Sequence, residues 1–272
     1  NLQGSITVPS SKSQTLRAIL FASLAKGKSI INKYLQSTDT QAMIHACRLL
    51  GAKIEIFPQH LEIEGIAGQV HQFEDVIQSG NSGIVLRFLT AIGALSPYYT
   101  VITGDHSIRH QRPIQPLLDG LKQLSAFAVS TKADGFAPVI IRGPLKPGTV
   151  TISGEDSQPV SALLIASAFV EGKIDIKVKN PGEKPWVSLT LNWFDRLGIQ
   201  YTNDRFENYQ VFGKCSYEGF SYTVPGDFST AAFPLVAALV TQSELVLENI
   251  DIHDPQGDKE LIFVLQRMGA HI

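Results

Sequence analysis

The sequence predicts an α/β protein made of repeated β-α-β-α-β-β units. Short stretches rich in Ile and Val alternate with longer apolar runs of helical spacing, which indicates alternating strands and helices. The same succession of segments returns four times, at intervals of about 72 residues. Hydrophobic residues make up 44% of the 272 residues and charged residues 18%, a balance that allows a sizeable core in one or two domains.

Each copy opens with a strand that runs into a loop of small polar residues. The four segments are SITVPSSKS (5–13), DVIQSGNSG (75–83), VTISGEDSQ (150–158) and YTVPGDFST (222–230). An apolar run follows each loop and predicts the first helix of the copy, at 15–25, 84–95, 159–170 and 230–240. Small polar residues before such a run are typical of a helix start.

The second half of each copy is a strand, a polar loop and another helix. Stretches at 28–35, 98–105, 173–180 and 243–250 predict the strands, and amphipathic runs at 40–52, 114–126, 186–199 and 261–270 predict the helices. We expect Gly51, Gly198 and Gly269 to end three of these helices and Pro113 to begin another. The segments AKIEIF (52–57) and HLEIEGI (60–66) predict a β-hairpin after the second helix.

The fourth copy is shorter than the other three. It ends on its second helix at Ile272, whereas the first three copies continue with strand residues, and the chain begins with Asn1 rather than Met. We therefore expect the sequence to be a piece of a longer protein. We also expect the fourth copy to expose apolar surface and to favour self-association or disorder near 226–272.

Composition and charge argue against several classes of protein. The net charge of −2 disfavours a general nucleic-acid surface, and no apolar run reaches the roughly 18 residues of a membrane span. The two cysteines stand in no motif, which favours a reducing cytoplasm. His106 and His110 are four residues apart without a glutamate in zinc-protease register, so we expect no metal site there.

The loop at 9–13 carries the strongest indication of anion binding. A helix start presents unpaired N–H donors and a partial positive charge, and both favour phosphate or carboxylate. Lys12 adds a compact charge, and Ser13 and Arg17 share a helix face because they are four residues apart. The serines of this loop would equally serve as ordinary helix caps, so both interpretations remain open.

Two further stretches are suited to anions. Residues 80–83 read Gly-Asn-Ser-Gly, a sequence that favours a backbone nest, and Arg87 follows one helical turn later. The stretch 103–113 contains Arg109 and Arg112, which we expect to point into a shared cleft.

At these loops the sequence resembles the EPSP synthases, the family of 3-phosphoshikimate 1-carboxyvinyltransferases. PSSKS at 9–13 with Arg17 is similar to the family signature PGSKSxSxR, and GNSG at 80–83 with Arg87 is similar to GN(A/S)GTxxR. The stretches at 39–43, 103–113, 156–164 and 226–233 are similar to SDDTxxM, TGDxSLRxRP, SSQxxSALL and GDxSSAxF. The matches follow in order along the whole chain.

The resemblance implies the inside-out α/β barrel fold of the enolpyruvyltransferases, with two domains of three units each. Residues 10–225 would form one complete domain, and 1–9 with 226–272 would form part of the second. The implied reaction transfers the enolpyruvyl group of phosphoenolpyruvate to the 5-hydroxyl of shikimate 3-phosphate, giving 5-enolpyruvylshikimate 3-phosphate and phosphate in aromatic amino-acid biosynthesis. The resemblance implies no metal, no organic cofactor, no nucleic-acid or membrane partner, and a cytoplasmic, monomeric full-length enzyme.

The resemblance also implies roles for individual residues. Lys12 would be catalytic and would contact both substrates. Shikimate 3-phosphate would be held by Lys12, Ser13, Arg17, Ser157 and Gln158. Phosphoenolpyruvate would be held by Lys12, Asn81, Gly83, Arg112 and Gln158. The proton-transferring carboxylates of the family belong to later units, so we expect this stretch of chain to be inactive alone.

Several positions depart from the family pattern. Ile84 replaces a Thr, so we expect an altered phosphoenolpyruvate pocket and altered affinity for the inhibitor glyphosate. Asp156 and Glu183 each replace a Ser, and Trp186 replaces a Tyr. The two added acids would weaken phosphate binding unless they are turned away or protonated.

Two alternative functions remain at this point. A UDP-N-acetylglucosamine enolpyruvyltransferase is built from the same unit, but it carries an AKN-type triplet where this chain has Ser11, Lys12 and Ser13. A non-enzymatic anion-binding module would need only the helix-opening loops.

Overall fold

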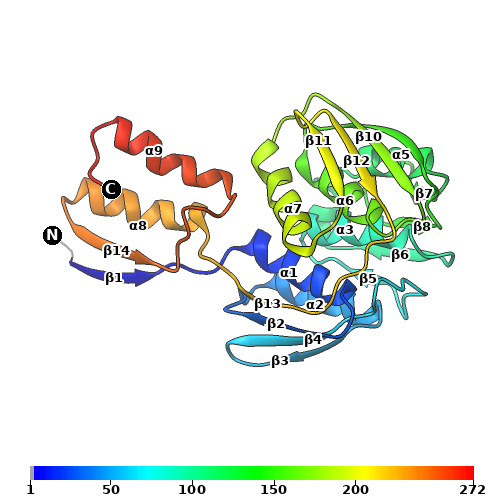
Figure 1. Cartoon of the computed structure of the whole chain (residues 1–272), viewed down its shortest axis with the longest axis horizontal. Coiled ribbons are helices and arrows are strands. Elements are labelled where there is room, and N and C mark those ends of the chain that lie inside the picture. Colours follow the sequence, from blue (N-terminus) through cyan, green and yellow to red (C-terminus); the bar gives the residue numbers. More distant parts are fainter. Residues whose placement is uncertain (1–2) are drawn as a thin grey trace.

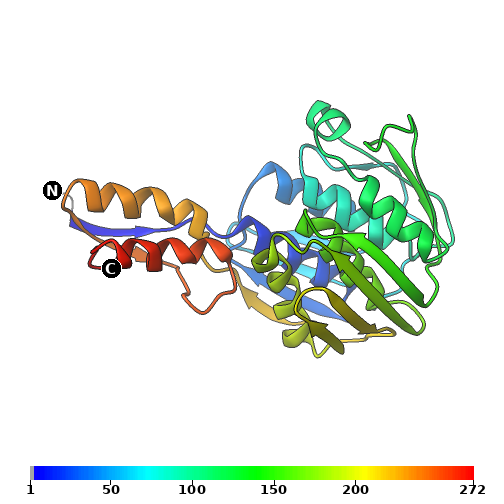
Figure 2. The same cartoon turned by 90° about the horizontal axis from the view of Figure 1, so that it is seen from above.

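The structure, a computed structural model, describes residues 3–272. They form a large body and a smaller lobe at one end of it (Figures 1 and 2). The body runs from α1 to β13. The lobe consists of β1 (Gln3–Thr7), α8 (Phe228–Val240), β14 (Glu244–Glu248), η1 (Gly257–Lys259) and α9 (Glu260–Arg267).

Three four-stranded sheets of one design make up the outside of the body. Their orders are β13-β2-β4-β3, β5-β6-β8-β7 and β9-β10-β12-β11, and in each the first two strands are parallel and the others antiparallel. The bounds are β2 (Lys28–Asn32), β3 (Lys53–Ile56), β4 (His60–Glu64), β5 (Ile77–Gln78), β6 (Thr100–Thr103), β7 (Phe127–Ser130), β8 (Val139–Arg142), β9 (Gly148–Ser153), β10 (Lys173–Lys179), β11 (Tyr201–Asp204), β12 (Asn208–Phe212) and β13 (Ser221–Thr223). Strands such as β10 alternate buried and exposed residues, so each sheet keeps one face in solvent.

Helices fill the inside of the body. They are α1 (Lys12–Leu24), α2 (Thr38–Leu49), α3 (Gly83–Gly93), α4 (His106–His110), α5 (Gln115–Gln123), α6 (Ser157–Ser167) and α7 (Lys184–Leu197). Nearly every residue of α1, α3 and α6 is buried, including the polar Gln14, Arg17 and Arg87, because these helices lie between the sheets. The fold is therefore an inside-out α/β arrangement, as the resemblance implies.

The body and the lobe exchange strands. β1 pairs in parallel with β14 in the lobe, whereas β13, which opens the fourth copy, pairs with β2 in the body. The two segments that connect body and lobe, at 9–11 and 225–227, run side by side. The Ser11 N–H donates to the carbonyl of Pro225 at 2.8 Å, and the Asp227 N–H donates to the carbonyl of Pro9 at 2.9 Å. The body and the lobe are thus joined by two chain segments that run antiparallel to each other.

The structure confirms the helices and strands predicted from the repeats. The three glycines predicted to end helices all have left-handed φ, with Gly51 at 111°, Gly198 at 68° and Gly269 at 95°. The predicted hairpin is β3 and β4. The placement of Pro113 was wrong, because α5 begins only at Gln115 and its N-cap is Ile114, so Pro113 lies just before the helix. Residues 106–110 form a short helix that the sequence analysis did not predict.

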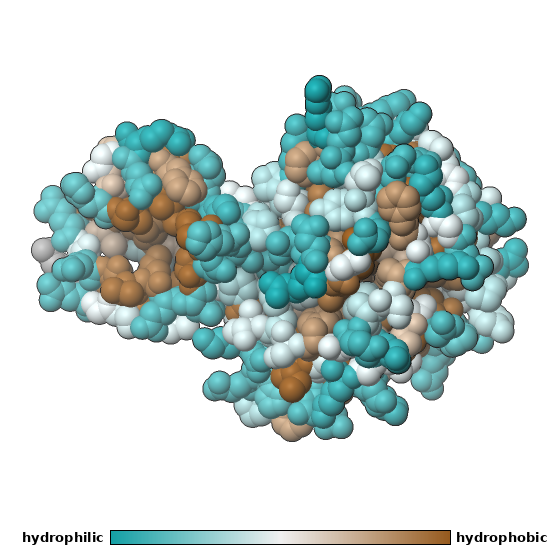
Figure 3. Space-filling view, in the orientation of Figure 1, coloured by the Kyte–Doolittle hydropathy of each residue, from teal (hydrophilic) through white to brown (hydrophobic). Residues whose placement is uncertain are grey.

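The apolar surface predicted for the fourth copy is present. Large apolar side chains of the lobe are exposed, among them Phe233 at 79%, Met268 at 77% and Val240 at 74%. Figure 3 shows hydrophobic residues gathered on the face of the lobe turned to the viewer. Within residues 3–272, no helix has both the length and the apolar character that crossing a membrane requires.

Candidate active site

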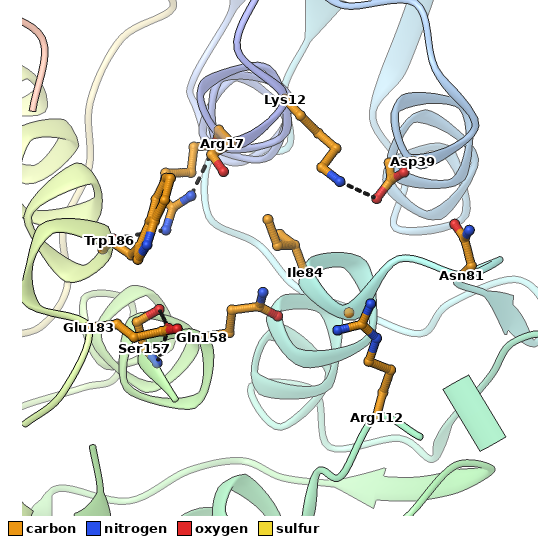
Figure 4. A pocket seen from close by; sticks show the side chains of 12 residues that line it. Lys12, Arg17, Asp39, Asn81, Ile84, Arg112, Ser157, Gln158, Glu183 and Trp186 are labelled. Carbon is orange, nitrogen blue, oxygen red and sulfur yellow. Dashed lines mark hydrogen bonds and ion pairs between the residues drawn. The ribbon is translucent and has the colours of Figure 1, made fainter. Parts of the chain in front are cut away.

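A polar cavity of about 260 Å³ lies where the N-terminal ends of α1, α3 and α6 converge (Figure 4). It is lined by Lys12, Ser13, Arg17, Asp39, Asn81, Gly83, Ile84, Arg112, Ser157, Gln158, Glu183 and Trp186. Every residue for which the resemblance implies a catalytic or substrate-binding role is in this set. The structure therefore brings the predicted residues together, while their roles stay predictions.

Capping residues set the position of the three helix starts. Ser11, Ser82 and Asp156 are the N-caps of α1, α3 and α6, and each accepts a hydrogen bond from a backbone N–H two or three residues later, at 3.4, 3.4 and 2.8 Å. The residues that immediately follow the caps line the cavity. Capping and cavity formation thus occur at the same loops, and the converging helix dipoles favour an anion.

Arg17 is a buried cation without an acidic partner. Its guanidinium donates to Thr190 Oγ1 at 3.0 Å and to the carbonyls of Ser13 and Trp186 at 3.2 Å each, and it lies 5.2 Å from the Phe88 ring centre. Burial lowers the pKa of Arg17 to about 9, so the group stays charged at neutral pH. Among residues 3–272 no carboxylate forms an ion pair with it.

Lys12 projects from the first turn of α1 into the cavity. Its side chain is half exposed, and Nζ lies 3.7 Å from Asp39 Oδ1. Asp39 stands in the first turn of α2, and sequence reasoning did not count it among the site residues. The only available signal was its place in the segment similar to SDDTxxM.

Arg87 links α3 to the start of α6 behind the cavity wall. It donates to Gln158 Oε1 at 2.7 Å and to the Pro113 carbonyl at 2.9 Å, and it forms an ion pair with Asp156 at 2.9 Å. Burial is the main cause that lowers the pKa of Arg87, and the Asp156 carboxylate opposes that shift. Asp156 is thus turned to a cation and does not line the cavity.

Gly83 has no room for a side chain. A Cβ atom there would lie 2.7 Å from Arg87 Nη1 and 3.2 Å from Gln158 Oε1, so any other residue would displace this hydrogen-bonded pair. Asn81, two residues before Gly83, is exposed and lines the edge of the cavity.

Glu183 is the one added acid that faces the cavity. Its Oε2 accepts hydrogen bonds from the Ser157 N–H at 3.2 Å and from the Ser157 hydroxyl at 2.7 Å. Of the two added acids, Asp156 is therefore turned away from the cavity and Glu183 is not.

The two arginines of the 103–113 stretch have different positions. Arg112 is exposed and lines the cavity, and Figure 4 shows its guanidinium directed inward. Arg109 instead donates to the Gly104 carbonyl at 3.0 Å and does not line the cavity, so the expectation of a shared cleft was wrong for it. Its side chain folds back to cap the strand-to-helix turn.

Comparisons with known proteins agree on one family. Residues 1–272 match the family EPSP synthase (3-phosphoshikimate 1-carboxyvinyltransferase). The 3-phosphoshikimate 1-carboxyvinyltransferase of Chlamydia trachomatis serovar D is 46% identical over 271 residues, which cover 99% of this chain and 61% of the relative. The protein of the same name from Acetivibrio thermocellus is 43% identical over 269 residues, which cover 99% of this chain and 63% of the relative.

A solved structure matches the fold as well. The EPSP synthase from Acinetobacter baumannii superimposes with a TM-score of 0.86 at 28% identity, covering 98% of this chain and 59% of that one. The chain thus spans about three-fifths of the length of the relatives it matches. On these grounds the chain belongs to the EPSP synthase family.

Proposed function

We propose that this protein transfers the enolpyruvyl group of phosphoenolpyruvate to the 5-hydroxyl of shikimate 3-phosphate. Arg17 is the observation that carries the proposal. A buried guanidinium that meets only neutral acceptors lacks a countercharge, and burying a charge without one is unfavourable. Both proposed substrates are polyanions that would supply it.

The arrangement of the cavity supports two substrate positions. In Figure 4, Arg17 and Ser157 lie on one side, Asn81 and Arg112 on the other, and Lys12 and Gln158 between them. We assign shikimate 3-phosphate to Lys12, Ser13, Arg17, Ser157 and Gln158. We assign phosphoenolpyruvate to Lys12, Asn81, Gly83, Arg112 and Gln158.

In the proposed reaction, phosphoenolpyruvate gains a proton at C3 while the 5-oxygen of shikimate 3-phosphate bonds to C2 and loses its proton. The tetrahedral intermediate then releases phosphate from C2 and a proton from C3, which restores the double bond. Lys12, Arg17 and Arg112 would stabilise the charges that develop and hold the two anions together. We assign no proton transfer to the residues of this chain.

We also propose that residues 10–225 form one domain and that 1–9 with 226–272 belong to a second. The pairing of β1 with β14 and of β13 with β2 supports this division. Asn1 and Leu2 lie outside the described residues. Lys12 and Ser13 of the cavity directly follow the segment that joins the two parts, so movement of one domain against the other would change the shape of the cavity.

We propose that the full-length enzyme is a cytoplasmic monomer. Both cysteines are free in the structure, and burial raises the pKa of each thiol to about 12, so neither is prone to form the reactive thiolate. This agrees with a reducing compartment.

Calorimetric titration of the chain with shikimate 3-phosphate tests the proposal. We expect Lys12→Ala to weaken binding by at least about tenfold. Lys26→Ala is the matched control, because Lys26 follows the other end of α1 and is also paired to an acid, Glu218, at 3.1 Å. Equal effects of the two substitutions, or binding of UDP-N-acetylglucosamine in place of shikimate 3-phosphate, would contradict the proposal.

A further inference from the structure

The start of α6 already holds an anion that belongs to the chain itself. Glu183 receives the Ser157 N–H and hydroxyl on a single carboxylate oxygen, at 3.2 and 2.7 Å. Ser157 is the first residue of α6 and is 3% exposed, so both of its donors are committed to this contact. A ligand anion that needs those donors must therefore displace the carboxylate.

The position of Glu183 in its own helix makes this contact unusual. Glu183 is the N-cap residue of α7, where a side chain ordinarily accepts a hydrogen bond from its own helix. No such bond is present, because the side chain reaches across to α6 instead. The carboxylate is thus held in the cavity by α6 rather than by capping of α7.

Glu183 also differs from the other acids around the cavity. Asp39 lies 3.7 Å from Lys12 Nζ, and Asp156 lies 2.9 Å from Arg87, so each of them has a cation. Within residues 3–272, Glu183 forms no ion pair. Its charge is therefore available to repel a second anion at the start of α6.

We propose that Glu183 is a specificity-determining residue that occupies a phosphate position at the start of α6 and competes with the phosphate group of the substrate. The inference rests on the proposed function, since it assumes that a phosphate-bearing substrate enters this cavity. Binding of the phosphate requires the Glu183 side chain to leave Ser157. The affinity of the site for a phosphorylated ligand is consequently lower than its cations alone would give.

Calorimetric titrations of four proteins test this role: the unsubstituted chain, Glu183→Ser, Glu183→Gln and Glu155→Gln. Glu183→Ser removes the competing carboxylate, and Glu183→Gln removes the charge while keeping an acceptor for Ser157. Glu155→Gln is the control, because Glu155 is an exposed acid just before α6 and makes no side-chain contact with Ser157. Each protein is titrated with shikimate 3-phosphate and with unphosphorylated shikimate.

We expect Glu183→Ser to bind shikimate 3-phosphate at least about tenfold more tightly than the unsubstituted chain, with Glu183→Gln in between. Glu155→Gln and the shikimate affinities should change by less than about twofold. A purely structural link between α6 and α7 would lower the melting temperature of the Glu183 variants without raising phosphate affinity.

The outcomes separate this inference from the proposed function. If all four proteins bind shikimate 3-phosphate equally, Glu183 does not compete and the inference is overturned alone. If Glu155→Gln tightens binding as much as Glu183→Ser, the effect is one of general charge, and the inference is again overturned. If none of the four binds shikimate 3-phosphate, the proposed function fails and the inference fails with it.

Discussion

The body and the lobe are built from the same repeat but differ in how far its first helix is buried. In α3, every residue after Gly83 is buried, whereas in the equally apolar α8 only Phe228 and Ala231 are. No residue of α9 is buried. An apolar run therefore predicts a helix, but its burial depends on neighbouring units, and α8 has fewer of them than α3 within the described residues.

The largest expected effect of this difference in burial is on stability, and it is tested by removing one phenylalanine side chain from each part. Phe21 in α1 is fully buried and stacks on Trp193 at 5.4 Å, so we expect Phe21→Ala to lower the free energy of unfolding by about 3 to 5 kcal/mol. Phe233 in α8 is 79% exposed, so Phe233→Ala should change it by less than about 0.5 kcal/mol. Urea denaturation followed by circular dichroism measures both, and similar losses would show that the lobe has a buried core of its own.

A buried glutamine connects the two parts. Gln14 donates from Nε2 to Asp254 Oδ2 in the lobe at 2.8 Å, and its Oε1 accepts from Trp193 Nε1 in the body at 2.8 Å. Gln14 and Asp254 are 1% and 8% exposed. Loss of the glutamine would therefore leave a buried carboxylate and a buried indole N–H without these partners.

We expect Gln14→Leu to lower the free energy of unfolding by about 1 to 3 kcal/mol and to speed hydrogen exchange in 226–272. Gln123→Leu is the matched control, because Gln123 also bridges two elements, through two bonds of 2.9 Å to Thr151, but is exposed to water. We expect Gln123→Leu to lower the free energy of unfolding by no more than about 1 kcal/mol. Equal exchange rates in both variants would mean that Gln14 does not hold the lobe.

The pH dependence of this effect follows from Asp254. Burial raises the pKa of Asp254 above its ordinary value of 3.8, and the Gln14 hydrogen bond opposes the rise, so Gln14→Leu should raise it further. A raised carboxyl pKa means that the ionised form is disfavoured in the folded state. The loss of unfolding free energy that Gln14→Leu causes through Asp254 is therefore fully present above the pKa of Asp254 in the folded protein. This loss shrinks as the pH falls from there toward 3.8. Urea denaturation of Gln14→Leu and of the unsubstituted chain, at pH 7 and near the folded pKa of Asp254, measures this difference. We expect the variant to lose more unfolding free energy at pH 7.

Local sequence signals were enough to predict the helices and strands, whereas their inside-out arrangement was expected only from the family resemblance. The helical spacing, the capping residue before each run and the glycine after it all lie within a few residues of one another, which is why the helices and their ends could be predicted. The five-residue α4 was missed because it is shorter than any window in which periodicity can be recognised. Its cap, the Asp105 carboxylate that accepts from the Ile108 N–H at 3.0 Å, was the available signal.

The candidate site could be predicted only as far as individual motifs extend. The shared face of Ser13 and Arg17 follows from helix geometry, and the Arg17 hydrogen bond to the Ser13 carbonyl agrees with it. The pairing of Arg87 with Asp156 joins residues of different copies, so no local pattern contains it. For the same reason the sequence could flag Glu183 as an added acid without showing that it binds Ser157.

The smallest expected effect on stability concerns the exposed apolar face of the lobe. Phe233 and Val240 are 79% and 74% exposed, so replacing either with Lys removes apolar surface from water contact without opening a cavity. Lys at Val240 also places a positive charge at the C-terminal end of α8, where the helix dipole favours it. We therefore expect the free energy of unfolding to change by less than about 0.5 kcal/mol in each variant.

Self-association should nevertheless change clearly, because association depends on exposed apolar area and folding does not depend on these two side chains. In sedimentation velocity runs over a range of concentrations, the unsubstituted chain should form larger species, and Phe233→Lys with Val240→Lys should shift it toward the monomer. Ile56→Lys is the control, since Ile56 is an exposed apolar residue of the body, at 52%. If Ile56→Lys suppresses association equally, the surface that associates is not the lobe, and the difference in burial between the two parts would carry no consequence in solution.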